Sequence, residues 1–142
     1  YTPHDITHQG VGSEWNVRIP YPAGTEFGLG RWSPTLGVTR IDAHRLEREL
    51  DVAREFQLRH DVPIYVGEFS CVRWAPEGSA RRWVRDALAL FERFGWAWTY
   101  HEFRGWPGWD AEIDSVDPTS TRRSDTAPVM ASLRAAMQRR PT

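Results

Sequence analysis

The sequence contains no lysine, and all 18 of its basic residues are arginine. Arginine supplies planar guanidinium donors that suit carboxylates and sugar hydroxyls. Cysteine is also scarce, because Cys71 is the single one, which excludes an internal disulfide framework. The 19 acidic residues balance the basic ones and leave a net charge of -1, so the charge gives no indication of a nucleic-acid or membrane partner.

Long hydrophobic runs are missing as well. No segment approaches the roughly 20 apolar residues that span a bilayer. No stretch has the hydrophobic region of a signal peptide either. Because the sequence begins at Tyr1 rather than at Met, we expect it to be the downstream part of a longer protein.

Aromatic residues, in contrast, are abundant. The 142 residues include eight Trp, six Phe and four Tyr, more than the core of one domain of this size requires. Flat aromatic rings stack on ring-shaped ligands, so the excess indicates ligand binding. Residues 1–36 are rich in Gly and Pro without a sustained period, which predicts that residues 1–41 are mainly a long surface loop.

The spacing of apolar residues predicts three helices and two strands in the rest of the chain. The first helix covers residues 42–60, with Asp42 as N-cap and the apolar stripe Leu46, Leu50, Ala53 and Phe56. The second ends at Gly95 and has the stripe Ala80, Trp83, Val84, Ala87, Leu88, Phe91 and Phe94. The third covers residues 127–138, with Met130, Leu133 and Met137 facing inward. The strands are residues 63–69 and 96–101.

The order of these elements predicts an α/β fold with a parallel sheet. A helix links the two strands, and such a connection in one sheet forms a right-handed βαβ unit. Two parallel strands alone leave apolar sheet edges unpaired. We therefore expect missing upstream sequence, or a second copy of the chain, to complete the sheet.

Residues 62–70 form an apolar run that ends near a carboxylate, Glu68. A run of this composition after a proline predicts a strand buried on both faces of a parallel sheet. Carboxylates are rarely buried without a partner, whereas parallel α/β folds place their chemistry at the carboxyl ends of the strands. Glu68 is therefore the first candidate for catalysis. The alternative is a strand-end carboxylate that pairs with an arginine for structural reasons.

Three segments resemble glycoside hydrolase family 5, the cellulase-like (β/α)8 barrels. Residues 1–10 (YTPHDITHQG) look like the end of the sixth strand and the loop after it. Residues 64–69 (IYVGEF) are similar to the seventh strand, and residues 96–109 occupy the place of the eighth strand and its aromatic loop. The resemblance implies one domain over residues 1–142, the C-terminal part of a TIM (β/α)8 barrel with about strands 6–8. The barrel is incomplete here, because a whole one takes about 250 residues.

The resemblance also implies a catalytic pair. Glu68 matches the nucleophile of the family, and Tyr1 matches the tyrosine that donates a hydrogen bond to it. The acid/base of the family lies in an Asn-Glu pair on the fourth strand, and no such pair occurs in this sequence. A retaining glycosidase needs both carboxyl groups, about 5–5.5 Å apart. We therefore expect upstream sequence to supply the acid/base.

Glu102 is another carboxylate at a strand end, but its side chain alternates with that of His101, so at most one of them enters the barrel mouth. We assign the mouth to His101, which stands where many members of the family carry a sugar-stacking tryptophan. Asp110 and Glu112 are the remaining acidic candidates. The expected substrate-binding residues follow the strands: His8, Trp74, His101, Trp106 and Trp109.

Neither a metal nor an organic cofactor is implied by the resemblance. His4 and His8 have the i, i+4 spacing of a zinc site on a helix, but Pro3 and the surrounding turn residues argue against a helix there. Cys71 has no base at a readable spacing and is expected to be a small buried hydrophobe.

Two functions follow from these observations. The first is a secreted retaining glycosidase, endo-β-1,4-glucanase-like, that cleaves a β-glucan or related polysaccharide. The second is a catalytically incomplete barrel fragment that acts as a self-associating or sugar-binding module. The partner is the missing N-terminal barrel portion in the first case and a second copy of the chain in the second.

Overall fold

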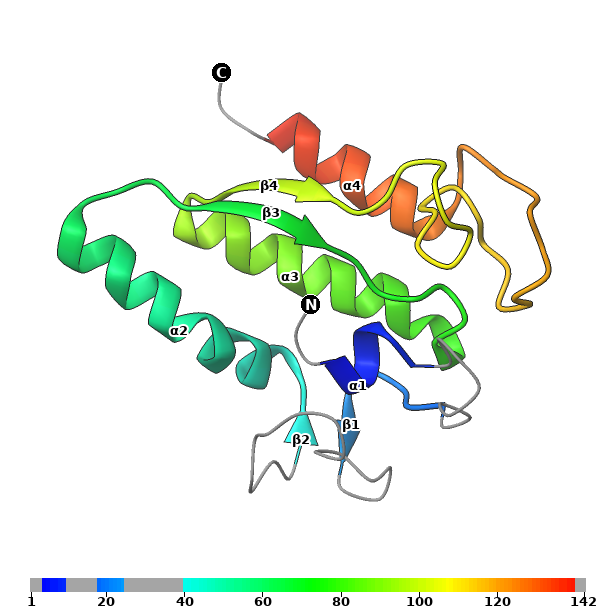
Figure 1. The fold of residues 1–142 in the computed structure, drawn as a ribbon, viewed down its shortest axis with the longest axis horizontal. Coiled ribbons are helices and arrows are strands. Elements are labelled where there is room, and N and C mark those ends of the chain that lie inside the picture. The colour runs from blue at the N-terminus through cyan, green and yellow to red at the C-terminus, as the bar shows by residue number, and fades with distance from the viewer. Residues whose placement is uncertain (1–3, 10–17, 25–39, 140–142) are drawn as a thin grey trace.

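The computed structural model describes residues 4–9, 18–24 and 40–139. Helices and strands follow one another along the chain (Figure 1): α1 (His4–Thr7), β1 (Ala23–Gly24), β2 (Arg40–Ile41), α2 (Ala43–His60), β3 (Tyr65–Phe69), the 3-10 helix η2 (Pro76–Gly78), α3 (Ser79–Phe94), β4 (Ala97–Tyr100) and α4 (Pro128–Arg139). The predicted α/β class is confirmed. The described strands form two two-stranded sheets, β1–β2 and β3–β4, and do not close a barrel.

β3 and β4 pair in parallel, which confirms the predicted βαβ unit. α3 connects the two strands and lies behind them, with α2 and α4 on either side (Figure 1). The register brings together Tyr65 with Ala97, Val66 with Trp98, and Phe69 with Tyr100, and it is irregular between Val66 and Phe69. The carboxyl ends of both strands therefore lie at the same end of the sheet.

The prediction that residues 62–70 are buried on both faces is wrong for this chain. Tyr65 is 64% exposed, and Gly67 and Glu68 are exposed as well. On the neighbouring strand, Ala97 and Thr99 are exposed on either side of the buried Trp98. The physical reason is that helices cover one face of this two-stranded sheet, whereas no described element packs on the other face (Figure 1).

The covered face meets the apolar stripe of α3. Phe69 is 2% exposed, and its ring makes edge contacts with Phe91, Trp98 and Tyr100 at centroid distances of 5.1, 5.6 and 5.5 Å. Trp83 packs beside it, as the helical spacing predicted. Gly95 ends the helix in the left-handed region at φ 70°, a conformation that glycine adopts without strain.

α2 confirms the predicted helix and its cap. The Asp42 side chain accepts a hydrogen bond from the Arg45 N–H at 3.0 Å. Of the predicted stripe, Leu46 is buried, but Phe56 is 53% exposed and does not face the core. Near its carboxyl end the helix instead turns polar side chains toward α3, where Arg54 and Gln57 both donate to the carbonyl of Phe94.

The described part of the N-terminal region is more than a surface loop. It holds α1 and the short antiparallel pair β1–β2, and Ile6 and Tyr21 are almost completely buried. The side-chain amide of Gln9 donates to the carbonyl of Ile19 and accepts a hydrogen bond from the N–H of the same residue. These contacts explain why the segment is partly buried and not only a surface loop: a Gly- and Pro-rich segment can pack against the core when its backbone polar groups have hydrogen-bond partners.

α4 packs on α3 through Leu133 and Ala136, both buried. The prediction that Met137 faces inward is wrong, since it is 57% exposed. Ala136 occupies the inward position one residue earlier. No helix in the described ranges has the length and apolar character that a membrane crossing requires.

The cap of α2 gives a first test. Replacing Asp42 with alanine leaves the N–H of Arg45 without its acceptor, so we expect the free energy of unfolding to fall by about 1 kcal/mol. Urea denaturation followed by circular dichroism measures the change. Asp51→Ala, on an exposed position of the same helix, is the control and should not destabilise the chain. Equal losses in both variants would contradict the capping role.

Candidate active site

Glu68 lies at the carboxyl end of β3, on the exposed side of the sheet. Its neighbour Phe69 is buried under α3, whereas Gly67 and Glu68 are both exposed at the point where the register with β4 is irregular. Within residues 4–9, 18–24 and 40–139, none of the ion pairs formed by arginine involves Glu68. The described part of the chain therefore gives no support to the alternative that this carboxylate serves a structural ion pair.

Three segments meet at this end of the sheet. The backbone N–H of His101 donates to the carbonyl of Phe69 at 3.1 Å, which places the end of β4 directly beside the end of β3. The N–H of Val72 donates to the carbonyl of Thr7, also at 3.1 Å, and brings in the end of α1. The strand-end position of Glu68 is thus bordered by the end of β4 and by the end of α1.

All five predicted substrate-binding side chains belong to one aromatic cluster. The Trp109 ring contacts those of His8, His101 and Trp106 at centroid distances of 5.2, 5.4 and 4.7 Å. Trp106 also meets Trp74 edge-on at 5.3 Å. These residues come from three separate loops, so the tertiary structure brings together what the sequence predicted one by one. This cluster, His8, Trp74, His101, Trp106 and Trp109, is called the aromatic platform below.

The members of the aromatic platform differ in exposure. Trp106 is 40% exposed and presents an accessible indole, whereas Trp74 is 7% exposed. The Trp74 indole N–H donates to the carbonyl of Gln9 at 2.7 Å. Trp74 therefore packs against the inner side of Trp106. Its burial does not favour the prediction that Trp74 itself contacts a ligand.

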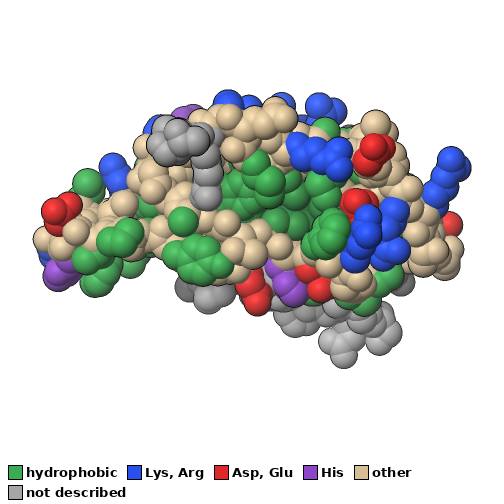
Figure 2. Space-filling model, turned by 90° about the horizontal axis from the view of Figure 1, so that it is seen from above, with side chains coloured by type: hydrophobic (Ala, Val, Ile, Leu, Met, Phe, Trp, Pro, Cys, Tyr) green, Lys and Arg blue, Asp and Glu red, His purple; other side chains and the backbone are tan. Residues whose placement is uncertain are grey.

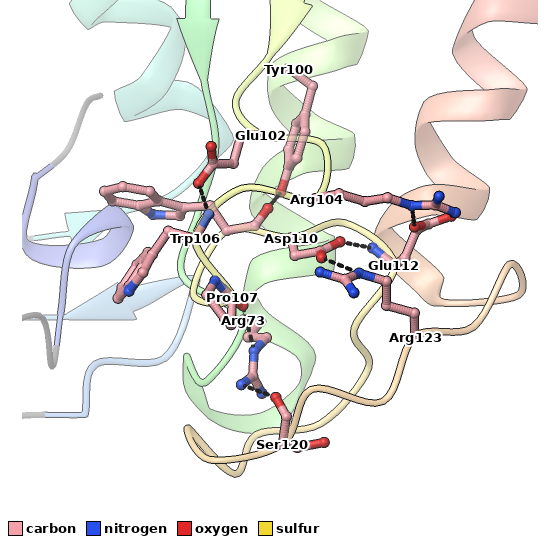
Figure 3. A network of polar contacts seen from close by, with 11 residues as sticks. Arg73, Tyr100, Glu102, Arg104, Trp106, Pro107, Asp110, Glu112, Ser120 and Arg123 are labelled. Carbon is pink, nitrogen blue, oxygen red and sulfur yellow. Dashed lines mark hydrogen bonds and ion pairs between the residues drawn. The ribbon is translucent and has the colours of Figure 1, made fainter.

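The loop after β4 shapes the aromatic platform through two glycines. The Glu102 carboxylate accepts the backbone N–H of Trp106 (Figure 3). A Cβ at Gly105 would lie 1.8 Å from this carboxylate, and one at Gly108 would lie 1.9 Å from the Trp106 ring. A side chain at position 108 would therefore collide with the indole, and one at position 105 would require the Glu102 carboxylate to move. Tyr100 closes the loop by donating its hydroxyl to the carbonyl of Trp109 at 3.0 Å.

The acidic residues near the aromatic platform are already engaged. Asp110 is fully buried and pairs with Arg123 at 2.7 Å. Glu112 forms a two-pronged pair with Arg104 (Figure 3), and the hydrogen bond from Arg104 holds the pKa of Glu112 below its ordinary value. An acid/base needs a raised pKa and an accessible proton. With Glu102 bound to Trp106, none of these three carboxylates suits that role.

The remaining candidates fall outside catalysis or outside the described residues. α1 covers His4–Thr7, so a short helix forms where the sequence predicted a turn, and His8 follows it with its Nδ1 2.8 Å from the Thr7 hydroxyl. No cluster of three metal-ligating side chains occurs in the described ranges. Cys71 is buried, as predicted, and burial raises the pKa of its thiol. Tyr1 lies outside the described residues.

Sequence reasoning missed two residues that organise this region. Gln9 ties the segment after α1 to Ile19, and Arg73 reaches into the loop after β4. Neither belongs to a motif. Arg73 is one of 18 arginines, and nothing in its immediate sequence distinguishes it from the exposed ones.

The fold has clear counterparts among solved structures, although no sequence-family model and no curated protein sequence matches the chain. Thermotoga maritima Cel5A in complex with cellobiose is 26% identical with a TM-score of 0.61, and the match covers 94% of this chain and 37% of that one. Its complex with mannotriose is 27% identical with the same TM-score and coverage. Subunit Z of the cellulose synthase of Clostridioides difficile matches at 20% identity, with a TM-score of 0.63 over 94% of this chain and 38% of that one. At that identity the likeness concerns the fold alone.

The Arg104–Glu112 pair makes the stability of this loop depend on pH. A carboxyl with a lowered pKa in the folded state stabilises the fold above its ordinary pKa of 4.5, and the contribution is lost as the pH falls below that value. We therefore expect Glu112→Gln to destabilise the chain at pH 6 and to have a smaller effect at pH 3. Urea unfolding at both pH values measures this, with the exposed Asp114→Asn as control. An equal effect of Glu112→Gln at both pH values would rule the mechanism out.

The three sequence segments and the structural matches point to the same part of a (β/α)8 barrel. The chain spans only 37% of the length of the first of these structures. The predicted resemblance is confirmed: this chain resembles the C-terminal portion of a cellulase-like (β/α)8 barrel of glycoside hydrolase family 5.

Proposed function

We propose that this chain carries the nucleophile and part of the sugar-binding surface of a retaining glycosidase that cleaves β-linked polysaccharides. One observation supports this more than any other. Glu68 stands exposed at the end of β3, without an arginine partner in the described residues, beside the strand that leads into the aromatic platform. A nucleophilic carboxylate needs this accessibility, and a pyranose ring needs an aromatic face nearby.

The proposed reaction has two displacements. A Glu68 oxygen attacks the anomeric carbon and forms a glycosyl ester, while the oxygen of the departing sugar takes a proton from the acid/base. Water then gives up a proton to the same acid/base and hydrolyses the ester, which restores Glu68 and retains the anomeric configuration. Tyr1 would donate its hydroxyl to Glu68 and keep that oxygen oriented for attack.

The acid/base would come from sequence outside this chain. Glu102, Asp110 and Glu112 are held by hydrogen bonds or ion pairs in the loop after β4. The exposed face of β3 and β4 is where the upstream strands of a whole barrel would pack.

The substrate we propose is a β-1,4-glucan or a related polysaccharide in the extracellular space. Structures of Thermotoga maritima Cel5A contain cellobiose in one case and mannotriose in another. The aromatic platform suits either sugar, because the axial C–H groups on the face of a pyranose ring pack on an indole ring.

A second candidate is a non-catalytic module that associates with another copy of itself. It is favoured by the apolar side chains that gather in the middle of the face seen in Figure 2, and by the exposed Tyr65 of β3 and Phe56 of α2. Sizing chromatography and an assay on a chromogenic cellobioside separate the two candidates. A dimer without turnover supports the module, whereas turnover supports the enzyme.

The nucleophile is tested in a protein that joins this chain to an upstream barrel portion with an acid/base. Glu68→Gln removes the attacking oxygen charge, so we expect kcat to fall on the order of 10,000-fold. Glu55→Gln, on an exposed position of α2, is the control and should leave activity unchanged. Near-full activity of Glu68→Gln would contradict the assignment of Glu68 as the nucleophile.

The aromatic platform is tested in the 142-residue chain itself. Trp106→Ala removes the exposed indole, and we expect the affinity for cellotetraose to fall about tenfold, as for loss of one stacked ring. Isothermal titration calorimetry measures it. Phe103→Ala is the matched control, because Phe103 is 63% exposed in the same loop and its ring meets Arg104, not the aromatic platform. Equal affinities of the two variants would contradict a sugar-binding role for Trp106.

A further inference from the structure

Arg73 is a buried arginine that pairs with no carboxylate among the described residues. It follows β3 in the chain, is 8% exposed, and sends its guanidinium into the loop between β4 and α4 (Figure 3). Nε donates to the carbonyl of Pro107 at 2.7 Å. The two Nη atoms donate to four further carbonyls of this loop: those of Ser115, Asp117, Pro118 and Ser120.

This arrangement uses the whole donor capacity of the side chain. A guanidinium has five N–H groups in a fixed plane, and here each has a carbonyl acceptor. Burial lowers the pKa of Arg73, opposed by the charges of Asp117 and Asp110. A lysine has three donors on one atom and cannot reach five carbonyls spread over residues 107–120. The geometry is therefore specific to arginine.

Arg73 also touches the base of the aromatic platform at two points. Its backbone N–H donates to the carbonyl of Gly108 at 2.9 Å, and Gly108 is the residue under the Trp106 ring. Its guanidinium carbon lies 5.6 Å from the centre of the Trp74 ring, which in turn meets Trp106 edge-on. The backbone and side chain of one residue thus fix the loop that carries Trp106 to the strand that carries Glu68.

We propose that Arg73 is a positioning residue that sets the aromatic platform against the Glu68 strand, and so determines how a sugar chain lies over the nucleophile. This inference rests on the sugar-binding part of the proposed function. The loop also has two other anchors, the Asp110–Arg123 and Glu112–Arg104 pairs. Loss of the Arg73 contacts should therefore loosen residues 105–120 without releasing the whole loop.

Arg73→Lys tests the proposal in the 142-residue chain, with Arg122→Lys, on an exposed position of the same loop, as the matched control. Hydrogen exchange measures protection of residues 105–120 and of α3. Calorimetry measures the affinity for cellotetraose, in the wild-type background and in the Trp106→Ala background. We expect exchange in the loop to rise about tenfold or more, since hydrogen bonds to a charged group are lost, with α3 unchanged.

The affinity readout separates positioning from a general structural effect. If Arg73 acts through the aromatic platform, Arg73→Lys should weaken cellotetraose binding about tenfold in the wild-type background and less than twofold when Trp106 is already alanine. Unchanged affinity, or an equal loss in both backgrounds, would overturn the proposal. If the wild-type chain binds no cellotetraose, the proposed function fails for this chain, and faster exchange confined to residues 105–120 still decides whether Arg73 holds the platform loop.

A measurement on the unmodified chain covers the case in which Arg73→Lys does not fold. A guanidinium held by five carbonyls should give separate, slowly exchanging NMR signals for its Nη protons, and these should shift on saturation with cellotetraose. One averaged signal, as an exposed and rotating guanidinium gives, would overturn the proposal.

Discussion

The packing of Phe69 against α3 is the contact on which the position of the candidate site depends. Its ring is enclosed by Phe91, Trp98 and Tyr100, which come from the helix and the neighbouring strand. The register of β3 is irregular between Val66 and Phe69, and there Gly67 and Glu68 are both exposed while Phe69 is buried on the helix side. A hydrophobic contact thereby anchors the strand end that carries a charged group, and this group makes no ion pair of its own in the described residues.

The loop after β4 is held through its backbone carbonyls. The loop after β4 has little regular structure, and its carbonyls are satisfied by Arg73 at one side, while two ion pairs hold its acidic residues at the other. Glycines at 105 and 108 let Glu102 and Trp106 lie directly on the loop backbone. An exposed indole can be held in one place by a loop of this kind because Arg73, Glu102 and Tyr100 bind the backbone on both sides of it.

Much of the fold could be predicted from the order and spacing of apolar residues. The helices around Leu46 and Trp83, the parallel pair of strands and the cap at Asp42 all follow local rules, and the structure has them. Two of the failures concern helix stripes. Phe56 and Met137 have the helical spacing of the apolar stripes, but no described element covers Phe56 and the inward position of α4 falls on Ala136, so both side chains are exposed.

The sequence by itself determined the order of helices and strands and the place of Glu68 at a strand end, because periodicity and capping act over a few residues. The tertiary structure alone decided that five separated side chains form one aromatic platform, and that Trp74 lies beneath Trp106. It also decided the role of Arg73, whose acceptors lie 34 to 47 residues further along the chain. Contacts over such separations depend on how loops close in space, and no local pattern of residue types encodes them.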